Sequence, residues 1–187
     1  YPYFSKSNIA KRAKEKPLGY AGDFEMMNQI YRNGYEGEDL TGEILHNYIA
    51  NEKSSQAVTF RKPYFTNEYL NCLVKNPNES VDILSLASGP CVEFQEMIKD
   101  FDQDRLDRIN LTLFDLDRTS LEHAQTKIYN TVYKENKDVN INFVNASVRV
   151  FLEQEEIDEI SKFNLIYSGG LFDYFDNKTS TALITNL

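Results

Sequence analysis

The spacing of apolar residues changes character near residue 80. Before that point, apolar positions recur every three or four residues, as they do in amphipathic helices. The predicted helices run from Phe24 to about Arg32, from about Thr41 to Asn51, and from Ser54 or Ser55 to Val74. From Val81 onward, short apolar runs alternate with helical patterns, which is typical of a parallel sheet with right-handed crossovers. We therefore predict a helical N-terminal cap (residues 1–79) and an α/β domain (residues 80–187).

The α/β domain is predicted to contain four strands, each followed by a helix. The strands are Val81 to Leu86, Leu111 to Phe114, Asn140 to Val144 and Phe163 to Tyr167. The helices begin near Cys91, at a cap formed by Thr119 or Ser120, after Ser147 (a short acidic helix to about Glu159) and near Asn177. Each connection is long enough for a crossover between parallel strands.

The cap region carries several local signals. Residues 1–16 are polar and basic and are expected to be a linker or a frayed helix. Asp23 is expected to cap the helix from Phe24, and Pro63 to bend or restart the third helix. In the second helix, Ile44, Leu45, Tyr48 and Ile49 are expected to face inward and His46 outward.

Small and polar residues follow all four strands. They are Ala87-Ser88-Gly89-Pro90 after the first strand, Asp115 after the second, Asn145-Ala146-Ser147 after the third, and Ser168-Gly169 after the fourth. Small residues let backbone N–H groups approach a ligand, and the carboxyl ends of parallel strands meet at one edge of the sheet. An acid after the second strand is the usual partner of a ribose. The pattern predicts a nucleotide-binding crevice at this edge.

Composition narrows the possible partners. The formal net charge of −9 argues against nucleic acid or an anionic membrane as the main partner. No apolar run is long enough to predict a membrane span. Of the two cysteines, Cys91 lies in the proposed ligand turn, so a disulfide is not expected and a cytoplasmic location is the default.

The segment LSLASGPC resembles the first motif of the class I S-adenosylmethionine-dependent methyltransferases, whose fold is Rossmann-like. The resemblance implies that Ala87, Ser88 and Gly89, with Pro90 beside them, wrap the methionine part of S-adenosylmethionine. It also implies ribose hydroxyls on Asp115 and adenine on Leu116. Asn145, Ala146 and Ser147 would lie near the adenine amino group, and Ser168 and Gly169 beside the sulfonium. The sequence departs from the motif at Ser85, where an acid is usual, and at Ala87 and Cys91, where glycines are usual.

A narrower resemblance rests on KPLGYAGDFEMMNQIYRNGYEG, the LSLASGP turn and LIYSGGLFDYF. Together they are similar to the bacterial 3-hydroxypalmitic acid methyl ester biosynthesis protein family. That family implies carboxyl methylation of a 3-hydroxy fatty acid, with a small molecule as methyl acceptor. Class I methyltransferases usually have seven strands in the order 3-2-1-4-5-7-6. We therefore expect a C-terminally truncated sheet whose fourth strand is an open edge, with self-association there as one outcome.

A carboxylate acceptor needs no general base, whereas a hydroxyl or amine acceptor would need one within hydrogen-bond reach. The candidates are Asp173, Tyr174 and Tyr20. Arg61 is a candidate partner for a carboxylate of cofactor or substrate. The turn from Gly19 to Asp23 is richer in special residues than a linker requires, and we expect it to fold over the strand ends. The methyltransferase interpretation calls for no metal ion.

Two alternatives remain open from the sequence. LTLFDLDRT also matches the first motif of haloacid-dehalogenase-like phosphatases, in which Asp115 would be the nucleophile, Asp117 the acid/base and Mg²⁺ the cofactor. That motif normally follows the first strand of its domain, whereas here a complete strand-turn-helix unit precedes it. The other alternative is a methyltransferase-like binding domain without catalytic activity.

Overall fold

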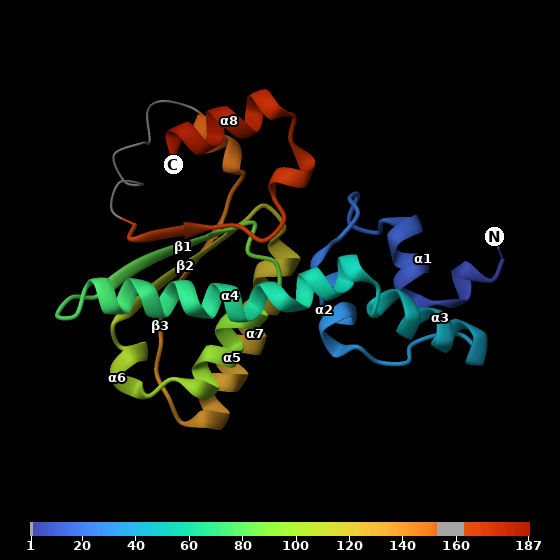
Figure 1. Cartoon of the computed structure of the whole chain (residues 1–187), viewed down its shortest axis with the longest axis horizontal. Helices are drawn as coiled ribbons and strands as arrows, with labels where there is room; N and C mark the ends of the chain where they lie inside the picture. Colours follow the sequence, from blue (N-terminus) through green and yellow to red (C-terminus); the bar gives the residue numbers. More distant parts are fainter. Residues whose placement is uncertain (1, 153–162) are drawn as a thin grey trace. The chain divides into compact units, whose positions relative to one another are not determined.

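Four parallel strands in the order β3-β2-β1-β4 form the sheet (Figure 1). They are β1 (Val81–Leu86), β2 (Ile109–Asp115), β3 (Asn140–Asn145) and β4 (Leu165–Tyr167). The computed structural model describes residues 2–152 and 163–187, so most of the acidic helix predicted to reach Glu159 lies outside the described residues. The order agrees with the first part of the expected methyltransferase order, and the predicted parallel Rossmann-like sheet is confirmed. Among the described strands, β4 pairs only with β1.

The chain divides into two compact units, Tyr1–Lys62 and Pro63–Leu187. The division falls inside α4 (Lys53–Lys75), a helix that continues through Pro63. The boundary predicted from the sequence, between residues 79 and 80, stays a prediction. Within the sheet unit, Tyr69, Cys72 and Leu73 from the second half of α4 are buried in the core.

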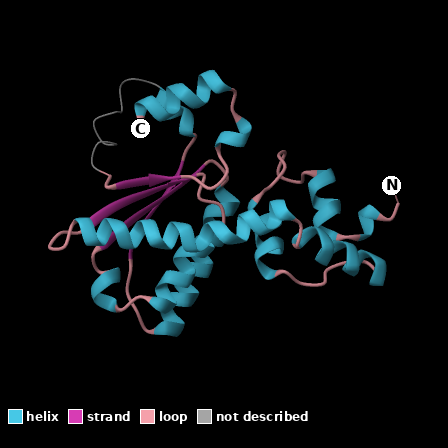
Figure 2. Ribbon diagram, viewed as in Figure 1, coloured by secondary structure: helices cyan, strands magenta, loops and turns pink. Residues whose placement is uncertain are grey.

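Helices cover both faces of the sheet in the C-terminal unit (Figure 2). One face packs on the second half of α4 and on α5 (Val92–Asp100) and α7 (Arg118–Glu135). The other packs on η2 (Val148–Leu152) and α8 (Asn177–Asn186). Successive β1 residues alternate between these layers, with Ile83 in the first core and Leu84 in the second. A four-residue helix, α6 (Gln103–Leu106), precedes β2 and was not predicted.

The N-terminal unit contains η1 (Phe4–Lys6), α1 (Asn8–Glu15), α2 (Phe24–Arg32) and α3 (Leu40–Ala50). The expectation of a linker or frayed helix over residues 1–16 was wrong. Ser7 caps α1 by accepting the Ala10 N–H, and Ile9 is fully buried, so both a cap and an apolar contact hold this segment. Asp23 caps α2 as predicted and also pairs with Arg12, whose Nε lies 2.6 Å from Asp23 Oδ1.

Helix α3 presents a different face from the one expected. His46 is fully buried, whereas Ile44 and Tyr48 are mostly exposed, which reverses the predicted orientation. The reason is a tertiary hydrogen bond, because His46 Nδ1 accepts the Ile9 N–H at 3.3 Å. The cap prediction for α4 was also wrong. That helix begins at Lys53, and Ser55 Oγ donates to the Ile49 carbonyl.

Stability of the N-terminal unit is expected to fall as the pH drops below about 6.5, the ordinary pKa of histidine. Burial lowers the pKa of His46; Glu36 opposes this shift and Arg32 adds to it. The unfolded chain therefore takes up a proton at a higher pH than the folded chain, and stability is lost as the pH falls toward the folded pKa. Protonated Nδ1 also loses its bond from Ile9.

Urea unfolding at pH 7.5 and 5.5 measures this loss. His46→Asn keeps a side-chain acceptor but does not titrate, so its stability should fall less than that of the wild type between the two pH values. His123→Asn removes the other histidine and measures how much of the wild-type pH dependence that group contributes. Equal losses in wild type and His46→Asn would contradict the assignment.

Candidate functional site

The turn after β1 adopts an unusual backbone conformation. Ala87, Gly89 and Cys91 have φ angles of +50°, +57° and +47°, all in the left-handed region. The Ser88 N–H donates to the Phe114 carbonyl at the end of β2, and the Cys91 N–H donates to the Ser88 carbonyl. A Cβ built on Gly89 would have no atom within 4 Å, so the space above this backbone is open. A ligand can therefore approach the turn closely at Gly89.

Asp115 lies against this turn. Its Oδ2 accepts the Gly89 N–H and its Oδ1 accepts the Asp117 N–H, both at 2.9 Å. Burial raises the pKa of Asp115, although these backbone donors partly offset the shift. Each carboxylate oxygen keeps a lone pair for a further donor. The Asp115 carboxylate therefore joins the ends of β1 and β2 and keeps acceptor capacity toward the open side of the turn.

Asn145 closes the next strand end. Its Nδ2 donates to the carbonyls of Asp115 and Leu116, both at 2.9 Å. These two hydrogen bonds fix the backbone that follows β2. The Leu116 side chain is 71 % exposed, so a flat ring can contact it. Ala146 packs into the second core, and Ser147 Oγ accepts the Arg149 N–H.

Three buried serine hydroxyls lack a hydrogen-bond partner among the described residues, and two of them lie at strand ends. Ser120 Oγ is on α7, whereas Ser88 Oγ is in the turn after β1 and Ser168 Oγ directly follows β4. The strands β1 and β4 are neighbours, with Ser85 opposite Tyr167. Buried hydroxyls normally find a partner, so two orphans at adjacent strand ends favour a polar ligand there. Gly169 follows Ser168 in the chain, and their place beside the sulfonium stays a prediction.

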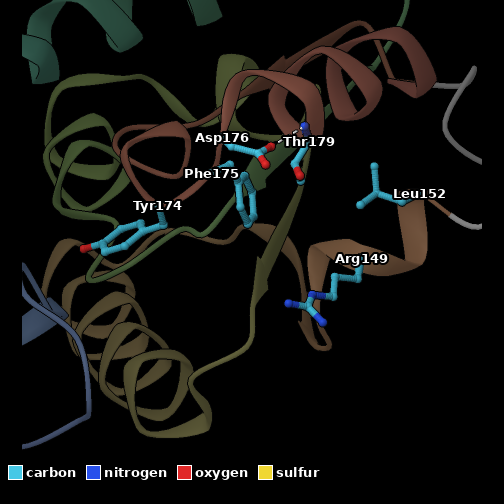
Figure 3. A pocket seen from close by; sticks show the side chains of 6 residues that line it. All are labelled: Arg149, Leu152, Tyr174, Phe175, Asp176 and Thr179. Atoms are coloured by element: carbon cyan, nitrogen blue, oxygen red, sulfur yellow. Dashed lines mark hydrogen bonds between the residues drawn. The ribbon is translucent and has the colours of Figure 1, made fainter.

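The predicted acid/base candidates after β4 lie on η4 (Phe172–Tyr174). Asp173 is exposed, and Tyr174 lines an open pocket of about 490 Å³ (Figure 3). The pocket lies between η2 and the start of α8, and its other lining residues are Arg149, Leu152, Phe175, Asp176 and Thr179. Asp176 caps α8 by accepting the Thr179 N–H at 2.7 Å.

Tyr20 and Arg61 belong to the N-terminal unit, and Tyr20 is half-buried there. Arg61 Nε donates to the Tyr31 hydroxyl at 3.4 Å, and its Nη2 lies 3.6 Å from Met27 Sδ. These contacts hold the Arg61 guanidinium on α2. The proposed roles of Tyr20 and Arg61 toward a cofactor or an acceptor stay predictions.

Asp117 serves as a helix cap. Its Oδ1 accepts the Thr119 N–H and the Thr119 hydroxyl, at 2.9 and 2.6 Å, and the Ser120 N–H at 3.4 Å. The prediction that Thr119 or Ser120 caps α7 was therefore wrong, because both donate to a cap two or three residues earlier. Among the residues placed by the structure, no group of three or more His, Cys, Asp or Glu could hold a metal ion. In the same residues, no helix has the length and apolar character of a membrane span.

Sequence reasoning missed a buried polar network beneath the strand ends. Tyr167 donates its hydroxyl to Glu93 Oε1 at 2.8 Å and lies 3.1 Å from the Tyr69 hydroxyl. Glu93 is 6 % exposed and Ser85 is 2 % exposed. The available signal was Ser85 itself, a polar residue between the apolar Leu84 and Leu86.

No family model matches the chain, and no curated protein matches it. Solved structures that match the chain include two with low sequence identity. One belongs to work on the conversion of a disulfide bond into a thioacetal group during echinomycin biosynthesis. Its sequence is 17 % identical to this chain, with a TM-score of 0.39. The match covers 64 % of this chain and 42 % of that one, so this chain spans less than half the length of that protein.

The other is the plantazolicin methyltransferase BpumL in complex with S-adenosylhomocysteine (SAH). It is 14 % identical with a TM-score of 0.34, and the match covers 95 % of this chain and 71 % of that one. Similarity at this level establishes neither a family nor an activity.

Proposed function

We propose that the chain is the cofactor-binding part of a class I S-adenosylmethionine-dependent methyltransferase. The observation that carries the proposal is Asp115, which the Gly89 N–H holds against an open left-handed turn at the ends of two adjacent parallel strands. The orphan hydroxyls of Ser88 and Ser168 fit a polar ligand at the same edge of the sheet. The resemblance of LSLASGPC to the first methyltransferase motif supports the same reading.

In this proposal, each part of the site has one task. Bound S-adenosylmethionine supplies a methyl group already activated on a sulfonium. Asp115 accepts hydrogen bonds from the ribose hydroxyls, and the turn from Ala87 to Pro90 receives the methionine part against its backbone. Ser168 and Gly169 border the reacting end. The protein mainly orients donor and acceptor and excludes water, which can contribute several kcal/mol to catalysis.

The acceptor is proposed to be a small acid, with carboxyl O-methylation of a 3-hydroxy fatty acid as the specific case. The narrower family resemblance and the acidic net charge support this choice over nucleic acid. The pocket beside η4 adds a cation, Arg149, and apolar walls from Leu152 and Phe175. A carboxylate acceptor is itself the nucleophile, so this chemistry needs no general base.

Methyl transfer from S-adenosylmethionine is the test of this assignment. The full-length protein should methylate 3-hydroxy fatty acids, detected by mass spectrometry as the methyl esters. Arg149→Gln should raise the KM for the acid by about tenfold, the order expected for one lost charge-assisted hydrogen bond. Arg118→Gln, which changes an exposed arginine on α7, is the matched control and should leave the KM unchanged. Methylation of protein or nucleic acid, with none of small acids, would contradict the proposed acceptor.

A further inference from the structure

The buried network beneath the strand ends links three segments that border the candidate site. Ser85 lies two residues before the left-handed Ala87, Tyr167 lies one residue before Ser168, and Glu93 lies in the first turn of α5. Ser85 and Tyr167 are register partners on β1 and β4, and their hydroxyls are hydrogen-bonded. The hydroxyl of Tyr167 therefore connects β4 to β1 and, through Glu93, to the helix after the turn.

The burial of the Glu93 carboxyl group requires a physical explanation. Burying Glu93 costs free energy unless its oxygens are hydrogen-bonded, and an apolar side chain of similar size would avoid that cost. Tyr167 meets the requirement directly, and the Cys91 thiol is also hydrogen-bonded to Glu93. Burial raises the pKa of Tyr167, so its hydroxyl keeps its proton and stays a donor. Such directional bonds fix the relative positions of their segments more narrowly than apolar contacts do.

Ser85 joins this network to β1. It is 2 % exposed, and the Tyr167 hydroxyl is hydrogen-bonded to both Ser85 and Glu93. The Tyr167 hydroxyl therefore links the end of β1 to the first turn of α5, on either side of the turn that contains Gly89.

We propose that Tyr167 and Glu93 are positioning residues that hold the turn after β1 in its left-handed conformation against the end of β4. The consequence of this proposal is that the cofactor meets a preformed turn, and that consequence rests on the proposed function. The positioning itself concerns only this chain and can be tested without any ligand.

Tyr167→Phe removes only the hydroxyl and keeps the ring, whose centroid lies 4.5 Å from that of Phe65 and 5.8 Å from that of Tyr69. Tyr69→Phe is the matched control, because it removes the other tyrosine hydroxyl of the network and leaves the Tyr167–Glu93 bond intact. Glu93→Gln is the conservative variant, because it keeps an acceptor oxygen for Tyr167. A purely structural role predicts similar effects for the two tyrosine variants.

Amide hydrogen exchange measured by NMR separates the two roles. In Tyr167→Phe, the Gly89 amide, which donates to Asp115, should exchange at least tenfold faster, while amides of the β2–β3 pairing keep their protection. Tyr69→Phe should leave Gly89 unchanged, and Glu93→Gln should stay within about threefold of wild type. Unchanged exchange of Gly89 in Tyr167→Phe, or equal acceleration at every amide, would overturn the proposal.

Calorimetry with SAH tests the consequence. Its affinity should fall about tenfold in Tyr167→Phe and stay within twofold of wild type in Tyr69→Phe. Wild-type affinity in Tyr167→Phe would overturn the inference while leaving the proposed function intact. A wild-type protein that does not bind SAH would overturn the proposed function, and the exchange of Gly89 would still decide whether the pair positions the turn.

Discussion

Asp115→Asn is expected to weaken SAH binding by about ten- to a hundredfold. Charge-assisted hydrogen bonds contribute about 1.5–3 kcal/mol each, and about 1.4 kcal/mol corresponds to a factor of ten in affinity. The asparagine has one acceptor oxygen for the two backbone donors, Gly89 and Asp117, that the carboxylate now satisfies. Its amide nitrogen must face one of these N–H groups, so the ribose site loses both charge and alignment. Isothermal titration calorimetry measures the loss directly.

Asp117→Asn is the matched control for this experiment. Asparagine is as good an N-cap as aspartate, so α7 should keep its first turn, and SAH affinity should stay within about threefold of wild type. The phosphatase alternative predicts the opposite pattern. In it, both substitutions would abolish Mg²⁺-dependent phosphate release, because one removes the nucleophile and the other the acid/base. Phosphatase activity lost in both variants, with no SAH binding by the wild type, would end the methyltransferase interpretation.

Gly89→Ala is expected to reduce SAH affinity by at least tenfold, with a smaller effect on stability. Gly89 has a φ of +57°, a conformation that costs an L-residue about 1–2 kcal/mol. We expect the free energy of unfolding of Gly89→Ala to fall by that amount. Among the described residues other than the chain neighbours Ser88 and Pro90, no atom lies within 4 Å of the added Cβ, so the methyl group projects into the space assigned to the cofactor. Calorimetry and urea unfolding on the same samples separate the two effects.

Asn136→Ala provides the control for backbone strain. Asn136 ends α7 with a φ of +52°, so alanine there is also strained, at the opposite end of the helix from Asp117. It should lower stability and leave SAH affinity unchanged. If Gly89→Ala binds SAH within twofold of wild type, the cofactor does not pass over this turn.

The strands and the turn after β1 were predictable because their signals are local. An apolar run followed by small residues specifies a buried strand and a close approach of backbone wherever the chain folds. The polar ends of the four strands could be brought together because parallel strands place their carboxyl ends at one edge. The sequence therefore predicts that Asp115 lies beside the turn after β1, and in the structure its carboxylate accepts the Gly89 N–H.

The errors arose where distant contacts decide the outcome. His46 is buried because Ile9, on another helix, donates to it, and helical periodicity contains no information about that partner. The cap of α7 was misassigned because Asp117, Thr119 and Ser120 all have capping side chains, and only the path of the backbone after β2 selects among them. The Tyr167–Glu93 bond joins residues 74 positions apart in sequence, so no local pattern indicates it.

A crystal structure of the protein with bound SAH tests the central claim most directly. The proposed function predicts both ribose hydroxyls within hydrogen-bond distance of the Asp115 carboxylate. It also predicts that the amino-acid part lies over Gly89, with the Ser88 and Ser168 hydroxyls now partnered. SAH bound elsewhere, or a ribose that does not contact Asp115, would contradict it.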